Sequence, residues 1–315
     1  MKSKLIKAVV FILIFFLLLM ISSRIVMPKN NSKEAGMHDY EANGIVAEKE
    51  NTIDLLVLGD SEAFTSISPM EIWNEYGYTS YVCCSTEQSI PESIILLMKA
   101  LKKQKPKMVI LEANTIYKAS KREDHLGKLL QYLIPVVEYH DRWKYLNKED
   151  WTGEINYNIV NDFKGYHFTK EVRPAKPGDK MKYTEEVQFI PRTNKIYVKL
   201  LKKYCQDNGI YFSIIRTPTT YSWDYKSYNG VKQFTDEEQI EFIDYNIISD
   251  KINIDWDHDS KDGGDHLNHY GALKTTKFFA KYLNEKNILT DHRNEEKYKE
   301  WHDSYSNYKR IVETD

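Results

Sequence analysis

Short apolar runs separated by segments of helical pattern recur along most of this chain, and this alternation constrains the fold more than any other feature. Each run is bounded by turn-forming residues, which is typical of strands buried in a parallel sheet. Strands connected through helices predict a three-layer α/β/α domain with a mostly parallel sheet. The predicted strands span residues 54–59, 78–84, 108–111 and 210–215. The predicted helices span residues 68–77, 91–104, 189–208, 236–248 and 273–283.

The predicted α/β domain covers residues 52–290, and one segment inside it breaks the alternation. Residues 119–186 are rich in Tyr, Trp, Lys and Asp. We expect an insertion there, partly helical, that could cover the carboxyl edge of the sheet. Residues 28–51 are polar and turn-rich, which predicts a tether. Residues 291–315 are charged and aromatic; we expect a helix laid over the domain, with a partner-binding arm as the alternative.

The amino terminus has the layout of an export signal. Lysines precede an unbroken apolar run from Ala8 to Ile21, and Arg24 follows it. The run is short for a membrane span, but a helix extended to Met27 reaches the needed length if Arg24 snorkels. We therefore expect residues 1–27 to form an uncleaved anchor with its amino end in the cytoplasm and the domain outside. A cleaved signal and a buried core helix are the alternatives, although no small-x-small cleavage site stands out.

Charge and cysteine content narrow the classes of function. The chain has 44 Lys and Arg against 46 Asp and Glu, and this balance disfavours a nucleic-acid binder. Three cysteines, of which Cys83 and Cys84 are adjacent, provide neither a disulfide framework nor paired Cys-x-x-Cys zinc ligands. The mean hydropathy of −0.58 averages a short apolar anchor and a polar domain. We expect no cofactor.

The first candidate for chemistry is the tripeptide Gly59-Asp60-Ser61, directly after the first predicted strand. A serine on a strand-to-helix turn lies at the carboxyl edge of the sheet, where open α/β folds place their sites. The glycine permits a tight turn, and the first N–H groups of the following helix can stabilise an oxyanion. An ordinary turn is the alternative interpretation.

The second candidate is the segment Asp262-Gly-Gly-Asp-His-Leu-Asn-His-Tyr-Gly271. A nucleophilic serine needs a general base, and His266 can supply one. A carboxylate would hold the imidazole in the right tautomer. Asp262 and Asp265 are both available, and Asp262 is preferred because adjacent side chains rarely face each other. A polar turn that caps the next helix is one alternative. A metal site is another, although no recognised ligand spacing is present among the clustered residues His258, Asp262, Asp265, His266 and His269.

Together, these two segments resemble the SGNH (GDSL-like) hydrolase superfamily. Its members carry the nucleophilic serine in a Gly-Asp-Ser-like motif after the first strand, and the acid and base in an Asp-x-x-His motif near the carboxyl end. That motif usually continues His-Pro-Asn-x-x-Gly, and His266, Asn268 and Gly271 match its offsets. The resemblance covers residues 53–283. It implies that Ser61 is the nucleophile and His266 its base.

The chain departs from the family pattern at three places. Gly263 stands where the family has its aspartate, so Asp262 is the implied acid and Asp265 the alternative. The family's second motif supplies a glycine N–H to the oxyanion hole. No glycine follows the second strand here, and Ser85 is the candidate instead. The third motif supplies an asparagine, for which Asn114 is the candidate, with a turn-forming role as the alternative.

The anchor and three further segments, 66–73, 88–92 and 105–109, look similar to a narrower bacterial group. Its members are exported SGNH-like proteins that work beside a membrane-bound O-acyltransferase, in alginate acetylation and in D-alanine transfer to teichoic acid. This resemblance implies an extracytoplasmic acyltransferase or esterase that acts through an acyl-serine intermediate. Its substrate would be the O-acyl groups of a cell-surface polysaccharide or teichoic-acid-like polymer, and its partner a membrane-bound O-acyltransferase.

One further residue is expected at the same site. Arg216 follows the fourth predicted strand, so it is a candidate for binding an anionic substrate, with a surface arginine in a turn as the alternative.

A second class of function is a catalytically inactive scaffold or polymer-binding subunit of a membrane acylation complex. Hydrogen-bond reach between Ser61 and His266 favours the enzyme, whereas a wide separation favours the scaffold.

Overall fold

The computed structural model describes residues 2–118, 122–176 and 178–314. Small parts of three predicted segments therefore lie outside the described residues: residue 1 of the anchor, residues 119–121 and 177 of the insertion, and residue 315 of the C-terminal segment. The chain divides into two units. The sheet domain comprises residues 41–119 and 160–315, and the N-terminal unit comprises residues 1–40 and 120–159.

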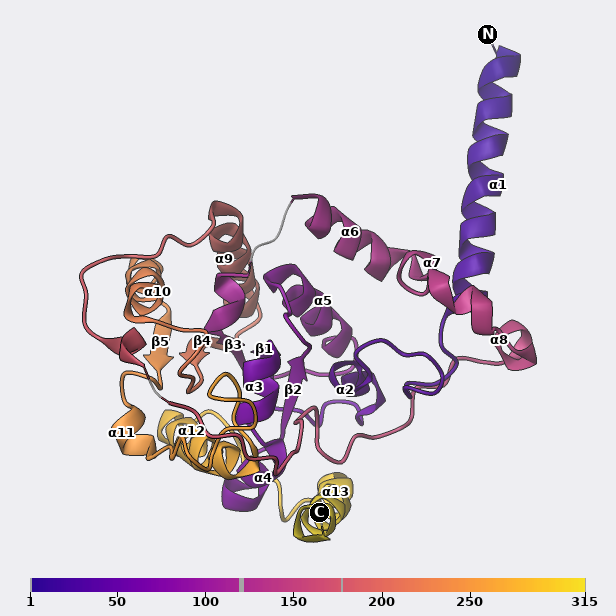
Figure 1. Cartoon of the computed structure of the whole chain (residues 1–315). Coiled ribbons are helices and arrows are strands. Elements are labelled where there is room, and N and C mark those ends of the chain that lie inside the picture. Colours follow the sequence, from indigo (N-terminus) through magenta and orange to yellow (C-terminus); the bar gives the residue numbers. More distant parts are fainter. Residues whose placement is uncertain (1, 119–121, 177, 315) are drawn as a thin grey trace. The chain divides into compact units, whose positions relative to one another are not determined.

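Five strands form the parallel sheet of the sheet domain (Figure 1). They are β1 (Leu55–Gly59), β2 (Ser80–Cys84), β3 (Met108–Glu112), β4 (Tyr211–Arg216) and β5 (Glu241–Asp244). The order across the sheet is β2-β1-β3-β4-β5, and Leu56 of β1 lies in register with Tyr81 of β2 and Val109 of β3. The strands β1, β2 and β3 are buried along their whole length, which explains their continuous apolar sequences.

This strand order determines where a site can form. The chain leaves β1 toward β2 on one side and then returns to β3 on the other side of β1. The connections after β1 and β3 therefore diverge, and the carboxyl ends of these two strands flank a switch point of the sheet. Doubly wound sheets of this order bind ligands at that point.

Helices cover both faces of the sheet. One face packs against α5 (Ile90–Ala100), α9 (Arg192–Asp207) and α10 (Tyr225–Glu237), which contribute Leu97, Leu201 and Phe234 to its core. The other face packs against α3 (Ser61–Ser66) and α12 (His269–Lys286), which contribute Phe64 and Phe279. This arrangement confirms the predicted three-layer α/β/α fold with a parallel sheet. The sheet domain also contains α2 (Tyr40–Asn43, which begins at the boundary), α4 (Pro69–Tyr76), α11 (Ser249–Ile252) and α13 (Lys299–Thr314).

The helix predicted over residues 236–248 is wrong, because this segment contains the edge strand β5. Helix α10 ends at Glu237, and Gln239 then adopts φ 53°, a left-handed conformation that stops the helix. The acidic residues before β5 have a helical pattern, which concealed the short run around Phe242. The sequence did not predict helix α10, because Gly230 lies in its middle and glycine disfavours a helix. The structure needs glycine there, since a Cβ atom would lie 2.1 Å from the Gln188 carbonyl oxygen.

The C-terminal segment contains α13, which lies against α4. The rings of Trp73 and Trp301 are 5.3 Å apart, and the Ser68 hydroxyl donates a hydrogen bond to the Tyr308 oxygen at 3.3 Å. Both tryptophans are buried, so the aromatic residues of this segment belong to the core of the sheet domain.

The N-terminal unit is helical. It contains α1 (Lys2–Val26), α6 (Arg122–Leu133), α7 (Pro135–Glu138), a 3₁₀ turn (His140–Tyr145) and α8 (Lys148–Thr152). Within the described residues, α1 alone is long and apolar enough to cross a membrane, as an anchor or a signal sequence does. The predicted insertion is shared between the units: residues 120–159 pack with the N-terminal segment, whereas residues 160–186 belong to the sheet domain.

The segment predicted as a tether has folded parts. Residues 28–40 form turns in the N-terminal unit, with buried Lys29 and Asn31 side chains. Asn31 exchanges two hydrogen bonds with the backbone of Ile159, at 2.7 and 3.0 Å. Farther along, Glu48 pairs with Lys164 of the sheet domain at 2.9 Å, and both side chains are buried.

Candidate active site

Ser61 lies at the turn where β1 ends and α3 begins. Gly59 is the last residue of β1, and a Cβ atom there would lie 2.6 Å from Glu112 Cβ, so this close approach of two strands needs glycine. Asp60 then caps α3, because its carboxylate accepts a hydrogen bond from the Glu62 N–H at 3.2 Å. Ser61 is consequently the first residue of α3, beside the switch point between β1 and β3.

The histidine loop (residues 260–267) is a tight hairpin just before α12. Ser260 and Leu267 form an antiparallel bridge at its base. At its tip, Gly263 and Gly264 have φ values of 88° and 105°, a backbone conformation that other residues rarely adopt. A Cβ atom at Gly264 would lie 2.0 Å from Thr220 Oγ1. The two glycines fold the chain back, so that the side chain of Asp262 faces that of His266.

Ser61, His266 and Asp262 form a continuous hydrogen-bonded chain. His266 Nε2 lies 2.7 Å from Ser61 Oγ, and His266 Nδ1 lies 2.5 Å from Asp262 Oδ2. Asp262 Oδ1 also accepts a hydrogen bond from the His266 N–H at 2.9 Å. When Nδ1–H donates to the carboxylate, Nε2 is free to accept the serine proton. This is the tautomer that a general base requires.

The structure separates the two candidate acids. Asp265 Oδ2 lies 3.7 Å from His266 Nδ1, beyond hydrogen-bond distance, and Asp265 Oδ1 has no partner among the described residues. Asp262 is four positions before the histidine, one more than in the family motif, and the turn at Gly263 and Gly264 accommodates the extra residue. The geometry therefore favours Asp262 as the group that orients His266.

Part of the predicted insertion supports the histidine loop. The Arg173 N–H donates to the Ser260 carbonyl at 2.8 Å, and the Gly263 N–H donates to the Arg173 carbonyl at 3.3 Å. The His269 N–H donates to the Thr169 carbonyl at 2.7 Å. These contacts join segments almost a hundred residues apart, and no local pattern in the sequence indicated them.

A buried ionic network lies under the serine turn. The Arg216 guanidinium pairs with Glu62 and with Glu112, the latter at 2.7 Å, and all three side chains are buried. Burial raises the pKa of Glu62 and raises the pKa of Glu112 to about 8, while the nearby guanidinium opposes both shifts. The Glu62 carboxylate also accepts a hydrogen bond from the Ser222 hydroxyl. Neither glutamate was predicted as a site residue. Glu62 directly follows Ser61, and Glu112 directly follows the predicted strand 108–111.

This network holds both neighbours of Ser61. The Asn114 amide donates to Asp60 Oδ2 at 2.8 Å and to Glu62 Oε1 at 3.3 Å. Lys118 pairs with Asp60 at 3.2 Å. Because the residues before and after Ser61 are anchored to β3 and β4, the network fixes the position of the serine backbone.

Arg216, the expected substrate ligand, lies in this buried network. Arg216 lies at the carboxyl end of β4, as predicted, but its side chain has no exposed surface. Its Nη atoms donate to Glu62, Glu112 and Ser222, and its guanidinium stacks over Trp223 at 4.8 Å. Arg216 therefore supports the serine turn in this structure, and its participation in substrate binding stays a prediction.

The two oxyanion candidates lie at the expected strand ends. Asn114 follows β3, but both of its amide hydrogens are donated to carboxylates in this structure. Ser85 follows β2, and its hydroxyl donates to Gln88 Oε1 at 3.0 Å. Their participation in an oxyanion hole stays a prediction.

Among the described residues, those that could share a metal ion are carboxylates under the serine turn, not the histidine-rich cluster that the sequence offered as an alternative. His258 is exposed and pairs with Asp255 at 2.8 Å, whereas His269 is buried beside Tyr166, and burial lowers its pKa to about 4. Within residues 2–118, 122–176 and 178–314, one group of carboxylates is close enough to share an ion: Asp60, Glu62 and Glu112. The cationic side chains of Arg216 and Lys118 already contact this group.

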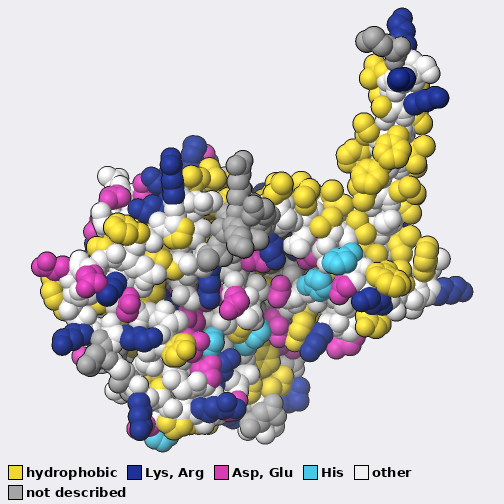
Figure 2. Space-filling model, turned by 45° about the horizontal axis from the view of Figure 1, so that its top comes forward, with side chains coloured by type: hydrophobic (Ala, Val, Ile, Leu, Met, Phe, Trp, Pro, Cys, Tyr) yellow, Lys and Arg dark blue, Asp and Glu magenta, His cyan; other side chains and the backbone are white. Residues whose placement is uncertain are grey.

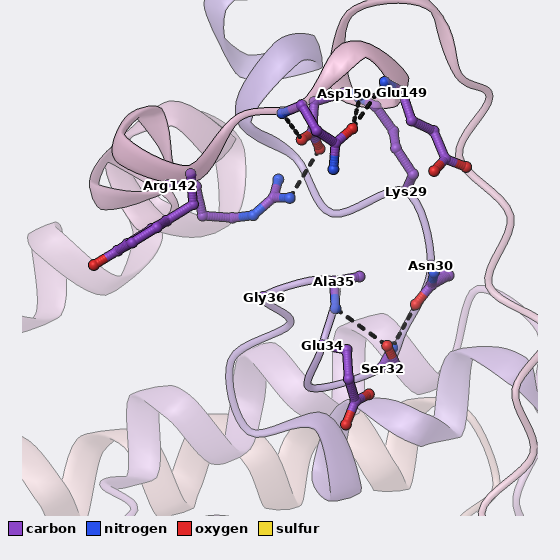
Figure 3. Close-up of a pocket in the computed structure, with 11 residues that line it drawn as sticks. Lys29, Asn30, Ser32, Glu34, Ala35, Gly36, Arg142, Glu149 and Asp150 are labelled. Carbon is purple, nitrogen blue, oxygen red and sulfur yellow. Dashed lines mark hydrogen bonds and ion pairs between the residues drawn. The ribbon is translucent and has the colours of Figure 1, made fainter.

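A cavity of about 380 Å³ lies in the N-terminal unit, and it contains none of the predicted site residues (Figure 3). Arg142 and Lys29 line it together with Glu34, Glu149 and Asp150. Arg142 is held by Asp150 at 2.8 Å. Charges of both signs line this cavity, so its lining does not select an anion over a cation.

The fold and the site together define a class of protein: a doubly wound α/β domain with a Ser–His–Asp chain at the carboxyl edge of its sheet. No protein-family model matches this chain, and no curated protein is similar to it. Solved structures are similar to it in part, and two of them come from Bacteroides species. One is a proposed acylhydrolase from Bacteroides fragilis, with 11% identity, a TM-score of 0.39, and coverage of 78% of this chain and 95% of that protein.

The other is a GDSL-like lipase from Bacteroides thetaiotaomicron. It is 9% identical, with a TM-score of 0.37 and coverage of 74% of this chain and 88% of that protein. At these identities and TM-scores, neither likeness assigns this chain an activity. The functional argument therefore depends on the geometry of its own residues.

Proposed function

We propose that this protein is a membrane-anchored, serine-dependent esterase or acyltransferase of the SGNH type. The observation that carries the proposal is the hydrogen-bonded chain from Ser61 Oγ through His266 to Asp262, with links of 2.7 and 2.5 Å. The first distance is within hydrogen-bond reach, so it favours an enzyme over an inactive scaffold.

In the proposed reaction, His266 Nε2 takes the proton of Ser61 while Oγ attacks the carbonyl carbon of an ester. The tetrahedral intermediate collapses when the bond to the alcohol oxygen breaks, and the alcohol leaves with the proton from His266. An acyl-serine remains. Water or a second hydroxyl group then attacks it, again with His266 as the base, and this second attack restores the serine. Asp262 keeps Nδ1 protonated and stabilises the imidazolium.

The oxyanion would be held by backbone N–H groups at Ser61 and Ser85. Asn114 could join them only by releasing one of its contacts to Asp60 or Glu62. Asn114 therefore supports the serine turn in the resting enzyme, whatever it does in the transition state.

The proposed substrates are O-acyl groups of a cell-surface polysaccharide or a teichoic-acid-like polymer, with a membrane-bound O-acyltransferase as the proposed partner. Helix α1 supports a location at the membrane, because its length and hydropathy suit an anchor. The motifs that resemble exported acylation proteins support the substrate class by analogy.

Ester hydrolysis by the purified full chain tests the proposal. With p-nitrophenyl acetate as the probe, Ser61→Ala and His266→Gln should each lower kcat by at least about a thousandfold. His258→Gln is the matched control, because His258 also pairs with an aspartate but is exposed, whereas the described hydrogen bond to Ser61 Oγ comes from His266. Full activity in Ser61→Ala would refute the assignment. Transfer of the acetyl group to a hydroxyl of an added polysaccharide, instead of release of free acetate, would distinguish acyl transfer from hydrolysis.

A further inference from the structure

Exposed apolar side chains gather on α6 of the N-terminal unit. Leu126, Leu129, Leu130 and Leu133 recur at the spacing i, i+3, i+4, i+7 and therefore share one face of the helix. These four side chains are 38–61% exposed. Figure 2 shows apolar side chains extending along this unit to the foot of α1. A contiguous apolar face of this kind marks an interaction surface rather than ordinary solvent-facing helix.

Exposed aromatic side chains also lie in this unit. Trp143 and Tyr145 in the 3₁₀ turn and Trp151 on α8 are 61–80% exposed. Tryptophan and tyrosine are enriched at the boundary between lipid and water, where their rings combine an apolar body with a polar atom. Lys144 and Lys148 are exposed between them and can reach lipid phosphates.

The carboxyl end of α1 is built into the same unit. Val26 packs with Met37 and Tyr139 in a small core. The Val136 N–H donates to Ser23 Oγ at 3.2 Å, and Arg142 donates to the Val26 carbonyl. Cleavage after α1 would remove part of this core, so the packing favours retention of α1 as an anchor. Figure 1 shows α6 and α7 extending sideways from the foot of α1.

We propose that α6, the 3₁₀ turn and α8 lie in the interface of the same bilayer that α1 enters. In this arrangement, the leucine face of α6 contacts the acyl chains and the aromatic side chains lie at the headgroups. Lipid is the occupant because the apolar side chains extend to the foot of α1, which is long and apolar enough to span a membrane, and because the unit carries the interfacial residue types. The proposal is independent of the chemistry at Ser61.

Site-specific fluorescence quenching in nanodiscs tests this proposal with the full chain. The three native cysteines are buried, so a thiol-reactive NBD probe reports on an introduced cysteine. Leu130→Cys and Leu133→Cys place the probe on the apolar face at two separate positions. Lys128→Cys is the matched control, because two residues along a helix turn the side chain to the opposite face. The nanodiscs contain phosphatidylcholine and phosphatidylglycerol, with or without a lipid that carries a doxyl quencher on its acyl chain.

The Leu130 and Leu133 probes should be quenched by doxyl lipid at least about threefold more than the Lys128 probe, and less by aqueous iodide. Equal iodide quenching on both faces would overturn the proposal, because the helix would then lie in water. Protection of the leucine-face probes from both quenchers would also overturn it, since protein would then cover this face.

Discussion

Replacement of Arg216 by methionine removes a charge that two buried carboxylates share. Arg216 has no exposed surface and pairs with Glu62 and Glu112. Methionine fills part of the same space but leaves both carboxylates without a cation, because Lys118 pairs with Asp60 instead. Loss of one partner of a buried ion pair costs about 3–5 kcal/mol of unfolding free energy, and we expect Arg216→Met to fall in this range.

The loss should also depend on pH. Burial raises the pKa of Glu112 to about 8 even beside Arg216, and removal of the guanidinium raises it further. The folded variant then keeps a proton that the unfolded chain releases above a pKa of about 4.3. The stability of both proteins falls as the pH rises above about 5, but that of the wild type levels off above about 8, whereas that of the variant keeps falling. Arg216→Met should therefore be more destabilised at about pH 9 than at about pH 6.

Urea unfolding of the full chain in detergent micelles, followed by circular dichroism, measures both effects. Arg173→Met is the matched control, because Arg173 is exposed, and it should change the free energy of unfolding by less than about 0.5 kcal/mol. Addition of Glu112→Gln to Arg216→Met should recover part of the loss, since it removes one of the unpaired charges. A loss below about 1 kcal/mol, or one that is the same at both pH values, would refute the reasoning.

Two further predictions concern the histidine loop. Asp262→Asn should lower kcat for ester hydrolysis by about a hundredfold to ten-thousandfold, whereas Asp265→Asn should lower it less than about tenfold, because only Asp262 is within hydrogen-bond distance of His266 Nδ1. Equal losses in steady-state kinetics would contradict this assignment. Gly264→Ala should cost about 1–3 kcal/mol in thermal or urea unfolding and reduce activity, because its Cβ would meet Thr220. Gly263→Ala, whose Cβ would meet open space, should cost less; a reversed order would contradict the loop geometry.

The sheet was largely predictable from the sequence because its central strands are continuous apolar runs between turn residues. β5 was not, because only a short run around Phe242 follows an acidic segment with helical character. The division into units was also beyond the sequence pattern. Residues 120–159 pack with residues 1–40, and such pairing of distant segments leaves no local periodicity.

The candidate site was predictable where its chemistry is local in sequence. Ser61 follows a strand directly, and His266 lies in a loop with its own acid. The supporting network was not predictable, because Glu62, Glu112 and Arg216 are single charged residues far apart along the chain. Such residues are normally exposed, and only the arrangement of β1, β3 and β4 buries them against one another.

Covalent labelling of the serine tests the central claim most directly. The full chain is treated with a fluorophosphonate, which reacts with serines activated by a general base, and intact mass spectrometry counts the adducts. The account predicts one adduct on the wild-type chain, located at Ser61 by peptide mapping, and none on Ser61→Ala or His266→Gln. An unlabelled wild-type chain, or an adduct that persists in Ser61→Ala, would contradict it.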